Sequence, residues 1–385
     1  HFQRNRSWVD RYSLTSLLTG HRGCVNTIRW SSEGQMLVSG SDDMMINLWE
    51  VGPHLLGRAI RPTACLPTSH RHNIFDAYVT SDLQRIVSCG ADGFVCMTHI
   101  HGQKTILFEP DMGHALAFKI AALPDSGGLN FFVSFGDGYV RHFDLRQERH
   151  GVAISTHGVG LAGLAVDPAQ GNLLAVGAND PFLRIYDVRA LRVGNEELRS
   201  DEPLTPVVSL HSTELMIRKQ HRNVSLSRFF SGRSDIGISG VCWNTDGKSL
   251  LANYRGGEIE LFDFGSGEPC LDNDTADGRI ISLPSDVCGE LTLPMSSVHL
   301  NSVRSYEGRV NEQTCAKEVH FLCGGSAVGS GGDCGSFFIW DTFSNQLLRK
   351  FRADRCIVNC VAPHPALPLV ATSGIDSEIK IFDVG

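Results

Sequence analysis

Short runs of alternating apolar and polar residues, separated by glycine-containing turns, fill most of this 385-residue chain. The stretch that begins at Gly20 shows the unit clearly. It has an alternating run, a turn at Gly34, a second apolar run, a turn with Asp43, and a third run that ends at Trp49 and Glu50. Alternation with a period of two residues predicts β-strands. The pattern therefore predicts an all-β chain built from repeated units of about three strands.

The same unit recurs along the chain, with a turn residue followed six positions later by the last core residue of the third strand. The seven pairs are Asp43 with Trp49, Asp92 with Thr98, Asp137 with Phe143, Asp180 with Tyr186, Gly256 with Phe262, Cys334 with Trp340, and Asp376 with Phe382. Most steps between neighbouring units are 42 to 49 residues, a period typical of propeller arrays. Radial stacking buries blade faces that one unit cannot bury alone.

Seven units predict a seven-bladed β-propeller, treated as a single domain. The expected blades are residues 20–50, 70–100, 114–146, 157–189, 235–264, 316–341 and 356–384. The last unit stops just after its third strand, so another segment must supply its outer strand. Residues 12–19, "YSLTSLLT", are expected to complete that blade and close the ring.

Two steps are much longer and predict long insertions on the propeller surface, where loops of this length carry recognition or are disordered. Residues 191–234 are rich in Arg and Ser, and residues 265–312 carry Glu268, Asp272, Asp274, Asp277 and Asp286. The basic segment 216–233 has two interpretations, a solvated loop or a docking segment for an acidic or phosphorylated partner.

The first unit resembles the WD40 repeat. In that repeat, the positions occupied here by His21, Ser39, Asp43 and Trp49 form an internal hydrogen-bond network, which satisfies polar groups inside the blade. A Ser, a His and an Asp in one repeat therefore do not indicate a hydrolase, and no "GxSxG" nucleophile motif accompanies them.

The charge balance and the remaining motifs argue against most other chemistry. A net charge of −8 disfavours direct binding to nucleic acid or to an anionic membrane. The most metal-like cluster is Cys315, His320, Cys323 and Cys334. Its only closely spaced pair is H-x2-C, whereas structural zinc sites use C-x2-C, so buried structural thiols are favoured over a zinc site. The glycine-rich segment 324–336 lacks the Gly-Lys-Ser/Thr of a phosphate loop. We expect no catalytic residues, no metal and no cofactor, and the 12 scattered cysteines fit the nucleus or cytoplasm.

Two consecutive repeats end alike, with "VRHFDLR" at 140–146 and "LRIYDVR" at 183–189. In each, the Asp and the Arg are two positions apart, so their side chains point to the same side of a strand. The two pairs are Asp144 with Arg146 and Asp187 with Arg189. The arginine either pairs only with its aspartate or serves a partner. The other five repeats lack it, so the fold does not require it.

These Asp-x-Arg pairs resemble the DWD box of the WD-repeat substrate receptors of cullin-4 RING ubiquitin ligases. Longer phrases such as "VGANDPFLRIYDVR" and "DCGSFFIWD" resemble the subgroup that includes the WD and tetratricopeptide repeat protein. The resemblance implies a non-catalytic receptor that recruits a protein substrate. It also implies that the damaged-DNA-binding protein 1 adaptor of the ligase binds at Asp144, Arg146, Asp187 and Arg189 of this chain.

The chain departs from the DWD box at the residue before each aspartate, where Phe143 and Tyr186 stand in place of Trp. The alternative function is a WD40 scaffold that binds a histone tail, a peptide or a complex subunit without a ligase. Recovery of the adaptor and cullin with the purified protein distinguishes the two.

Overall fold

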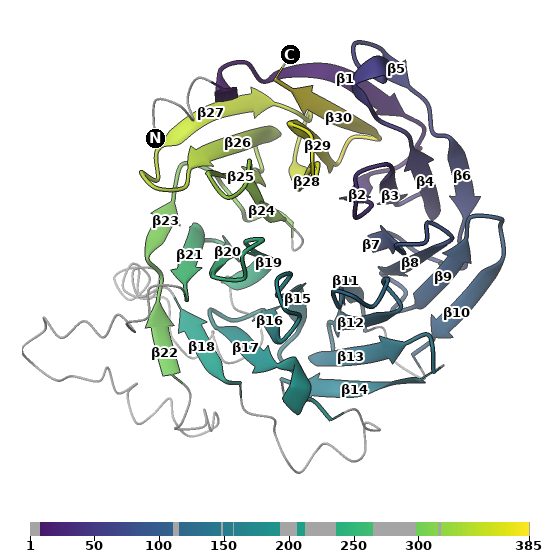
Figure 1. The fold of residues 1–385 in the computed structure, drawn as a ribbon, viewed down its shortest axis with the longest axis vertical. Helices are drawn as coiled ribbons and strands as arrows, with labels where there is room; N and C mark the ends of the chain where they lie inside the picture. Colours follow the sequence, from purple (N-terminus) through teal and green to yellow (C-terminus); the bar gives the residue numbers. More distant parts are fainter. Residues whose placement is uncertain are drawn as a thin grey trace, which may run out of the picture.

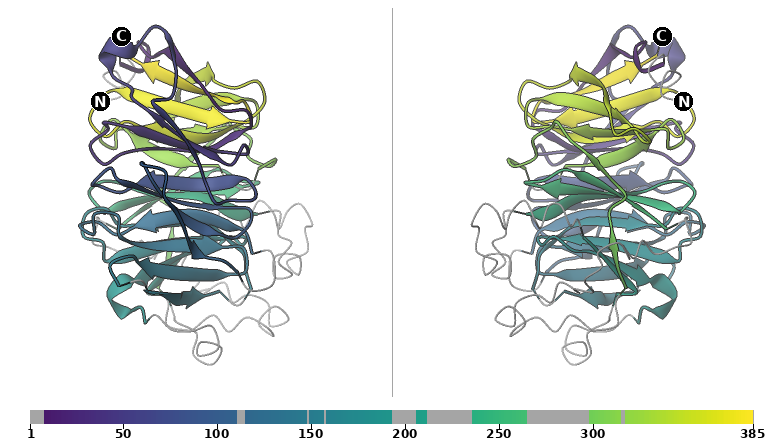
Figure 2. Two further views of the ribbon diagram at one scale, coloured as in Figure 1. Left: turned by 90° about the vertical axis from the view of Figure 1, so that its right-hand side faces the viewer. Right: turned by 90° about the vertical axis from the view of Figure 1, so that its left-hand side faces the viewer.

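The computed structural model describes residues 8–110, 115–147, 149–156, 158–192, 206–211, 236–264, 298–314 and 317–384. These residues form seven sheets arranged radially around a central axis, with the first strand of each sheet innermost (Figure 1). Side views show a ring that is shallower than it is wide (Figure 2). The prediction of an all-β, seven-bladed propeller closed by an N-terminal strand is confirmed.

Each blade is an antiparallel sheet of four strands, and the fourth and seventh blades each gain a fifth strand that pairs parallel at the outer edge. The first three blades are β2 (Val25–Trp30), β3 (Leu37–Ser41), β4 (Met45–Trp49), β6 (Ala64–Pro67); β7 (Ile74–Val79), β8 (Arg85–Gly90), β9 (Val95–His99), β10 (Lys104–Phe108); and β11 (Ala117–Ala122), β12 (Asn130–Phe135), β13 (Tyr139–Asp144), β14 (Arg149–Ser155). The fourth and fifth are β15 (Leu161–Val166), β16 (Leu173–Ala178), β17 (Leu183–Asp187), β18 (Val208–His211), β22 (Val298–Asn301); and β19 (Gly237–Trp243), β20 (Ser249–Arg255), β21 (Ile259–Asp263), β23 (Arg304–Tyr306). The sixth and seventh are β24 (Val319–Leu322), β25 (Ala327–Gly331), β26 (Ser336–Asp341), β27 (Leu347–Arg352); and β28 (Val358–Pro363), β29 (Leu369–Gly374), β30 (Glu378–Asp383), β1 (Ser13–Thr19), β5 (Ala59–Ile60). Two short 3-10 turns are η1 (Pro53–Leu55) and η2 (Val188–Ala190).

The ring closes where β1 pairs antiparallel with β30, in a register that runs from Ser13 opposite Asp383 to Thr19 opposite Glu378. The Thr15 hydroxyl also donates to the Ile381 carbonyl at 3.1 Å. A strand from the start of the described chain thus completes the last blade, as the sequence predicted.

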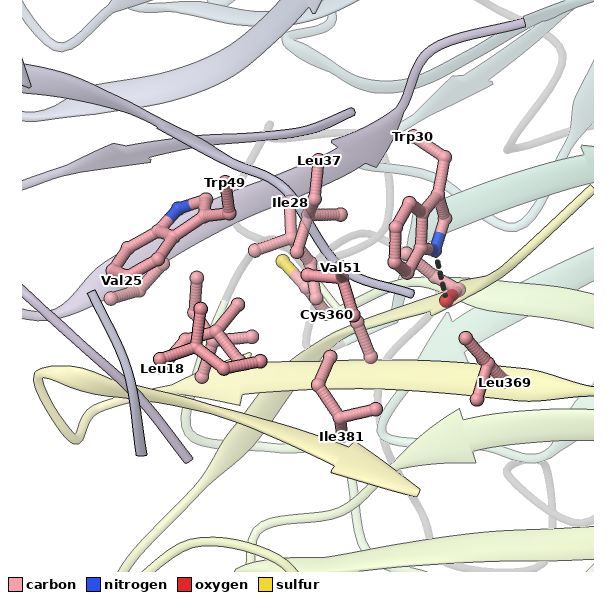
Figure 3. Packing of buried hydrophobic residues seen from close by; sticks show 14 residues of the cluster. Leu18, Val25, Ile28, Trp30, Leu37, Trp49, Val51, Cys360, Leu369 and Ile381 are labelled. Atoms are coloured by element: carbon pink, nitrogen blue, oxygen red, sulfur yellow. Dashed lines mark hydrogen bonds between the residues drawn. The ribbon is translucent and has the colours of Figure 1, made fainter. Parts of the chain in front are cut away.

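The apolar core lies between neighbouring blades. Where the first and seventh blades meet, Trp49, Leu18 and Ile381 belong to one buried cluster (Figure 3). The Trp30 indole donates to the Ala362 carbonyl at 3.0 Å, which links the two blades by a hydrogen bond. Because the core is shared in this way, each blade depends on its neighbours for burial.

The two predicted insertions contribute strands to the blades as well as loops. The first contains β18, the outer strand of the fourth blade, and the second contains β22 and β23. These outer strands carry no repeat motif, so the three-strand unit did not include them. The basic segment 216–233 and the five acidic residues of the second insertion lie outside the described residues.

Within the described ranges, no helix is long and apolar enough to cross a membrane.

Candidate functional site

The third blade presents Asp144 and Arg146 at the end of its third strand, β13. Arg146 donates from Nε to Oδ1 and from Nη2 to Oδ2 of Asp144, both at 2.9 Å, and its backbone N–H donates to Oδ1 at 3.0 Å. These hydrogen bonds outweigh burial and lower the pKa of Asp144. The guanidinium is therefore held by a charged, bidentate pair.

The fourth blade repeats this geometry with Asp187 and Arg189 at the end of β17. Nε and Nη2 of Arg189 donate to the two carboxylate oxygens at 3.0 and 2.8 Å, and its backbone N–H donates at 2.9 Å. The hydrogen bond from Arg189 lowers the pKa of Asp187. Asp187 also caps the following turn, η2.

Both arginines remain accessible although they are paired. The side chain of Arg146 is 52% exposed and that of Arg189 is 70% exposed. β13 and β17 are the third strands of neighbouring blades (Figure 1). Corresponding strands of a propeller run in the same direction, so both pairs lie at the same end of the propeller. The bidentate pairing uses Nε and Nη2, and the Nη1 group of each arginine is a further donor for a planar acceptor.

The sixth blade shows which part of this motif the fold needs. Asp341 ends β26 and accepts hydrogen bonds from the backbone N–H groups of Phe343 and Ser344 at 3.1 and 2.8 Å. The position two residues later, which holds arginine in the third and fourth blades, holds the exposed Phe343 here. The aspartate is thus a structural cap, and the arginine is an addition in the third and fourth blades.

The aromatic residues before the two aspartates belong to the core. Phe143 is buried and stacks on Phe131 with ring centroids 5.2 Å apart. Tyr186 is also buried, between the third and fourth blades. These rings position the strand ends from inside the blades and lack the indole donor that Trp340 uses to bond the Glu307 carbonyl.

The first blade contains the expected polar network. His21 bonds Asp43 through Nδ1 at 3.0 Å and Ser39 through Nε2 at 2.7 Å, and the Trp49 indole donates to the Ser39 hydroxyl at 2.8 Å. Burial raises the pKa of Asp43, but hydrogen bonds from His21 and a backbone N–H lower it to about 2. The Ser, His and Asp are used inside the blade, as expected of a structural network.

The turn aspartate has a basic partner in four further blades. In the second blade, His70 bonds Asp92 and Ser88 as His21 does in the first. In the third, fourth and seventh blades the partner lies four residues after the aspartate, in the pairs Asp137 with Arg141, Asp180 with Arg184, and Asp376 with Lys380. Ion pairing replaces the histidine network in these blades.

Asp354 shares the Asp376 and Lys380 site and makes the seventh blade sensitive to pH. Burial and the neighbouring Asp376 carboxylate raise the pKa of Asp354 to about 7. The folded state thus keeps a proton that an unfolded aspartate releases near pH 4, so this contribution to stability is present below pH 4 and is lost as pH rises through 7.

We expect Asp354→Asn to match the parent protein near pH 4 and to be about 1–3 kcal/mol more stable at pH 8, because the amide imitates the protonated acid. Urea denaturation of both proteins at the two pH values measures this. An equal stability difference at both pH values would contradict the assignment.

A charged cluster that sequence analysis missed lies on the inner strands. Asp76 accepts from Arg29 Nη2 at 2.9 Å and from the Ile120 backbone N–H at 2.8 Å. The buried Lys119 pairs with Glu318 and lies 3.8 Å from Asp76. The signal was present as single charged residues inside the apolar runs "IFDAYV" and "AFKIAA".

The cysteines and histidine considered for zinc do not form a metal site in the part of the chain that the structure describes, where no three His, Cys, Asp or Glu side chains are grouped to hold an ion. His320 contacts Cys242 and Glu318 instead. Cys323 and Cys334 are exposed thiols, and Cys315 lies outside the described residues.

Comparison with known proteins agrees with the repeat pattern. Residues 12–50 and 345–383 match the family model "WD domain, G-beta repeat". These two segments hold β1 to β4 and β27 to β30, which belong to the first, sixth and seventh blades.

Several proteins are similar to the chain over much of its length. Mouse "WD and tetratricopeptide repeats protein 1" is 27% identical over 276 residues, which cover 66% of this chain and 39% of that protein. Human "DDB1- and CUL4-associated factor 6" is 29% identical over 272 residues, 67% of this chain and 29% of that protein. The fission yeast "WD repeat protein iqw1" is 26% identical over 211 residues, which cover 49% of this chain and 25% of that protein. The matched region spans between a quarter and two-fifths of these relatives.

Proposed function

We propose that this chain, a WD40-repeat β-propeller, acts as a non-catalytic substrate receptor of a cullin-4 RING ubiquitin ligase. In this role Arg146 and Arg189 bind the damaged-DNA-binding protein 1 adaptor, and other surfaces recruit the protein to be ubiquitinated. The observation that carries the proposal is the pair of identical Asp-x-Arg arrangements at one end of neighbouring blades.

The charges of this site support a protein partner. Each aspartate fixes one edge of its guanidinium, so little side-chain entropy is lost when the exposed part meets a carboxylate or a carbonyl group. The sixth blade forms the same aspartate cap with phenylalanine at the arginine position, so the cap itself does not require these two arginines. The similarity to mouse and human "DDB1- and CUL4-associated factor 6" is consistent with this partner.

The test is co-purification of the adaptor with tagged protein. With the double variant Arg146→Ala/Arg189→Ala, we expect the amount of co-purified adaptor to fall at least about tenfold below that of the parent protein. The reason is that arginines are frequent hot spots of interfaces. Thermal unfolding should be nearly unchanged, since the backbone N–H groups still bond the two aspartates.

The matched control is Arg355→Ala, which removes another exposed arginine, between β27 and β28. It should retain the adaptor like the parent protein. Equal recovery with the double variant and the control would contradict the proposal and favour a scaffold that binds a histone tail, a peptide or a complex subunit.

A further inference from the structure

Three polar side chains follow one another between neighbouring inner strands, in the order Cys242, His320 and Glu318. Cys242 lies on β19 of the fifth blade and His320 on β24 of the sixth. The Cys242 Sγ is 3.7 Å from His320 Nδ1, and His320 Nε2 is 3.7 Å from Glu318 Oε2. A thiol, an imidazole and a carboxylate in this order form the arrangement that activates a sulfur nucleophile.

Further charges fix this arrangement. Lys119 pairs with the other oxygen of Glu318, so the carboxylate is held in place. Burial lowers the pKa of His320, but the Cys242 sulfur and the Glu318 carboxylate raise it overall, to about 9. The imidazole is therefore protonated at pH 7, and its positive charge beside Cys242 Sγ favours the thiolate.

The site is also accessible. Cys242 is partly exposed, and the His320 side chain is 33% exposed. In contrast, Cys89, Cys96 and Cys360 are buried, and burial raises the pKa of each thiol. Reactive thiols combine a basic neighbour with access to solvent, and Cys242 has both.

We propose that Cys242 is a peroxide-reactive thiol and a site of reversible oxidation. The Cys242 thiolate, beside the protonated His320, attacks one oxygen of hydrogen peroxide, so that an S–O bond forms while the O–O bond breaks. The leaving hydroxide takes the proton from His320 and departs as water. The sulfur is oxidised by two electrons to a sulfenic acid and the peroxide is reduced.

The test treats the protein briefly with hydrogen peroxide at pH 7, traps sulfenic acid with dimedone and measures each cysteine peptide by mass spectrometry. Cys65 and Cys356, which are more exposed, are the references. Cys334 is not a reference because Ser336 and Lys350 lower its pKa despite burial. We expect Cys242 to be labelled at least about tenfold faster than the references.

The variant His320→Gln should reduce labelling of Cys242 to the rate of the references or below. The exposed His54→Gln is the matched control and should leave labelling unchanged. Protection of the buried Cys89 and Cys96 reports in the same spectra whether the variant is folded. In the parent protein, labelling of Cys242 no faster than Cys65 overturns the proposal. An unchanged rate in a folded His320→Gln variant overturns the role of the imidazole.

Discussion

Replacing Glu318 by alanine is expected to lower the free energy of unfolding by about 3–5 kcal/mol, because it leaves a buried cation without its partner. Glu318 and Lys119 are both buried and pair with each other. Burial raises the pKa of Glu318, but Lys119 and His320 hold it well below its usual range. Without Glu318, Lys119 and Arg29 would share the single carboxylate of Asp76.

Urea denaturation followed by tryptophan fluorescence measures the effect. The matched control is Glu33→Ala, an exposed glutamate in the turn between β2 and β3, which should change stability by less than about 0.5 kcal/mol. The two variants lose the same side chain and differ in burial and partners.

The double variant Lys119→Met/Glu318→Gln separates the ion pair from the space it fills. It removes both charges and leaves Asp76 paired with Arg29 alone. We expect it to be more stable than Glu318→Ala, since replacing both members of a buried pair is often neutral. If it is less stable than Glu318→Ala, the interaction between Lys119 and Glu318 does not account for the loss.

The architecture could be predicted from the sequence because its determinants are local. Alternation, turn glycines and, in five of the seven units, an aspartate before the third strand repeat along the chain, and their period gives the number of blades. The closing strand could also be predicted, because the last unit lacked an outer strand. The outer strands β18 and β23 could not, since they are short segments without motif inside the insertions.

The candidate site was predictable as a pattern but not as a geometry. The sequence placed Asp144 and Arg146 on one side of a strand, and it left open whether they pair. The structure shows that they do, and that Asp341 caps the same turn with phenylalanine at the arginine position. The charged cluster on the inner strands depends on ring closure, because closure brings together Lys119 of the third blade and Glu318 of the sixth. No local sequence pattern specifies that pairing.

Ring closure itself is expected to depend on Leu18. This residue of β1 is 0% exposed, pairs with Ile379 of β30 and packs in the cluster with Trp49 and Ile381 (Figure 3). Leu18→Ala should lower the free energy of unfolding by about 2–5 kcal/mol, through lost burial and the cavity that remains. Because the cluster joins the first and seventh blades, the loss weakens the contact that keeps the ring shut.

Leu14→Ala on the same strand is the matched control. Leu14 pairs with Phe382 but is 48% exposed, so the same substitution should cost less than about 0.5 kcal/mol. Urea denaturation of the two variants compares them, and limited proteolysis shows whether β1 becomes accessible before the inner strands. Equal losses from Leu18→Ala and Leu14→Ala would mean that backbone pairing of β1 with β30, and not the buried cluster, holds the ring closed.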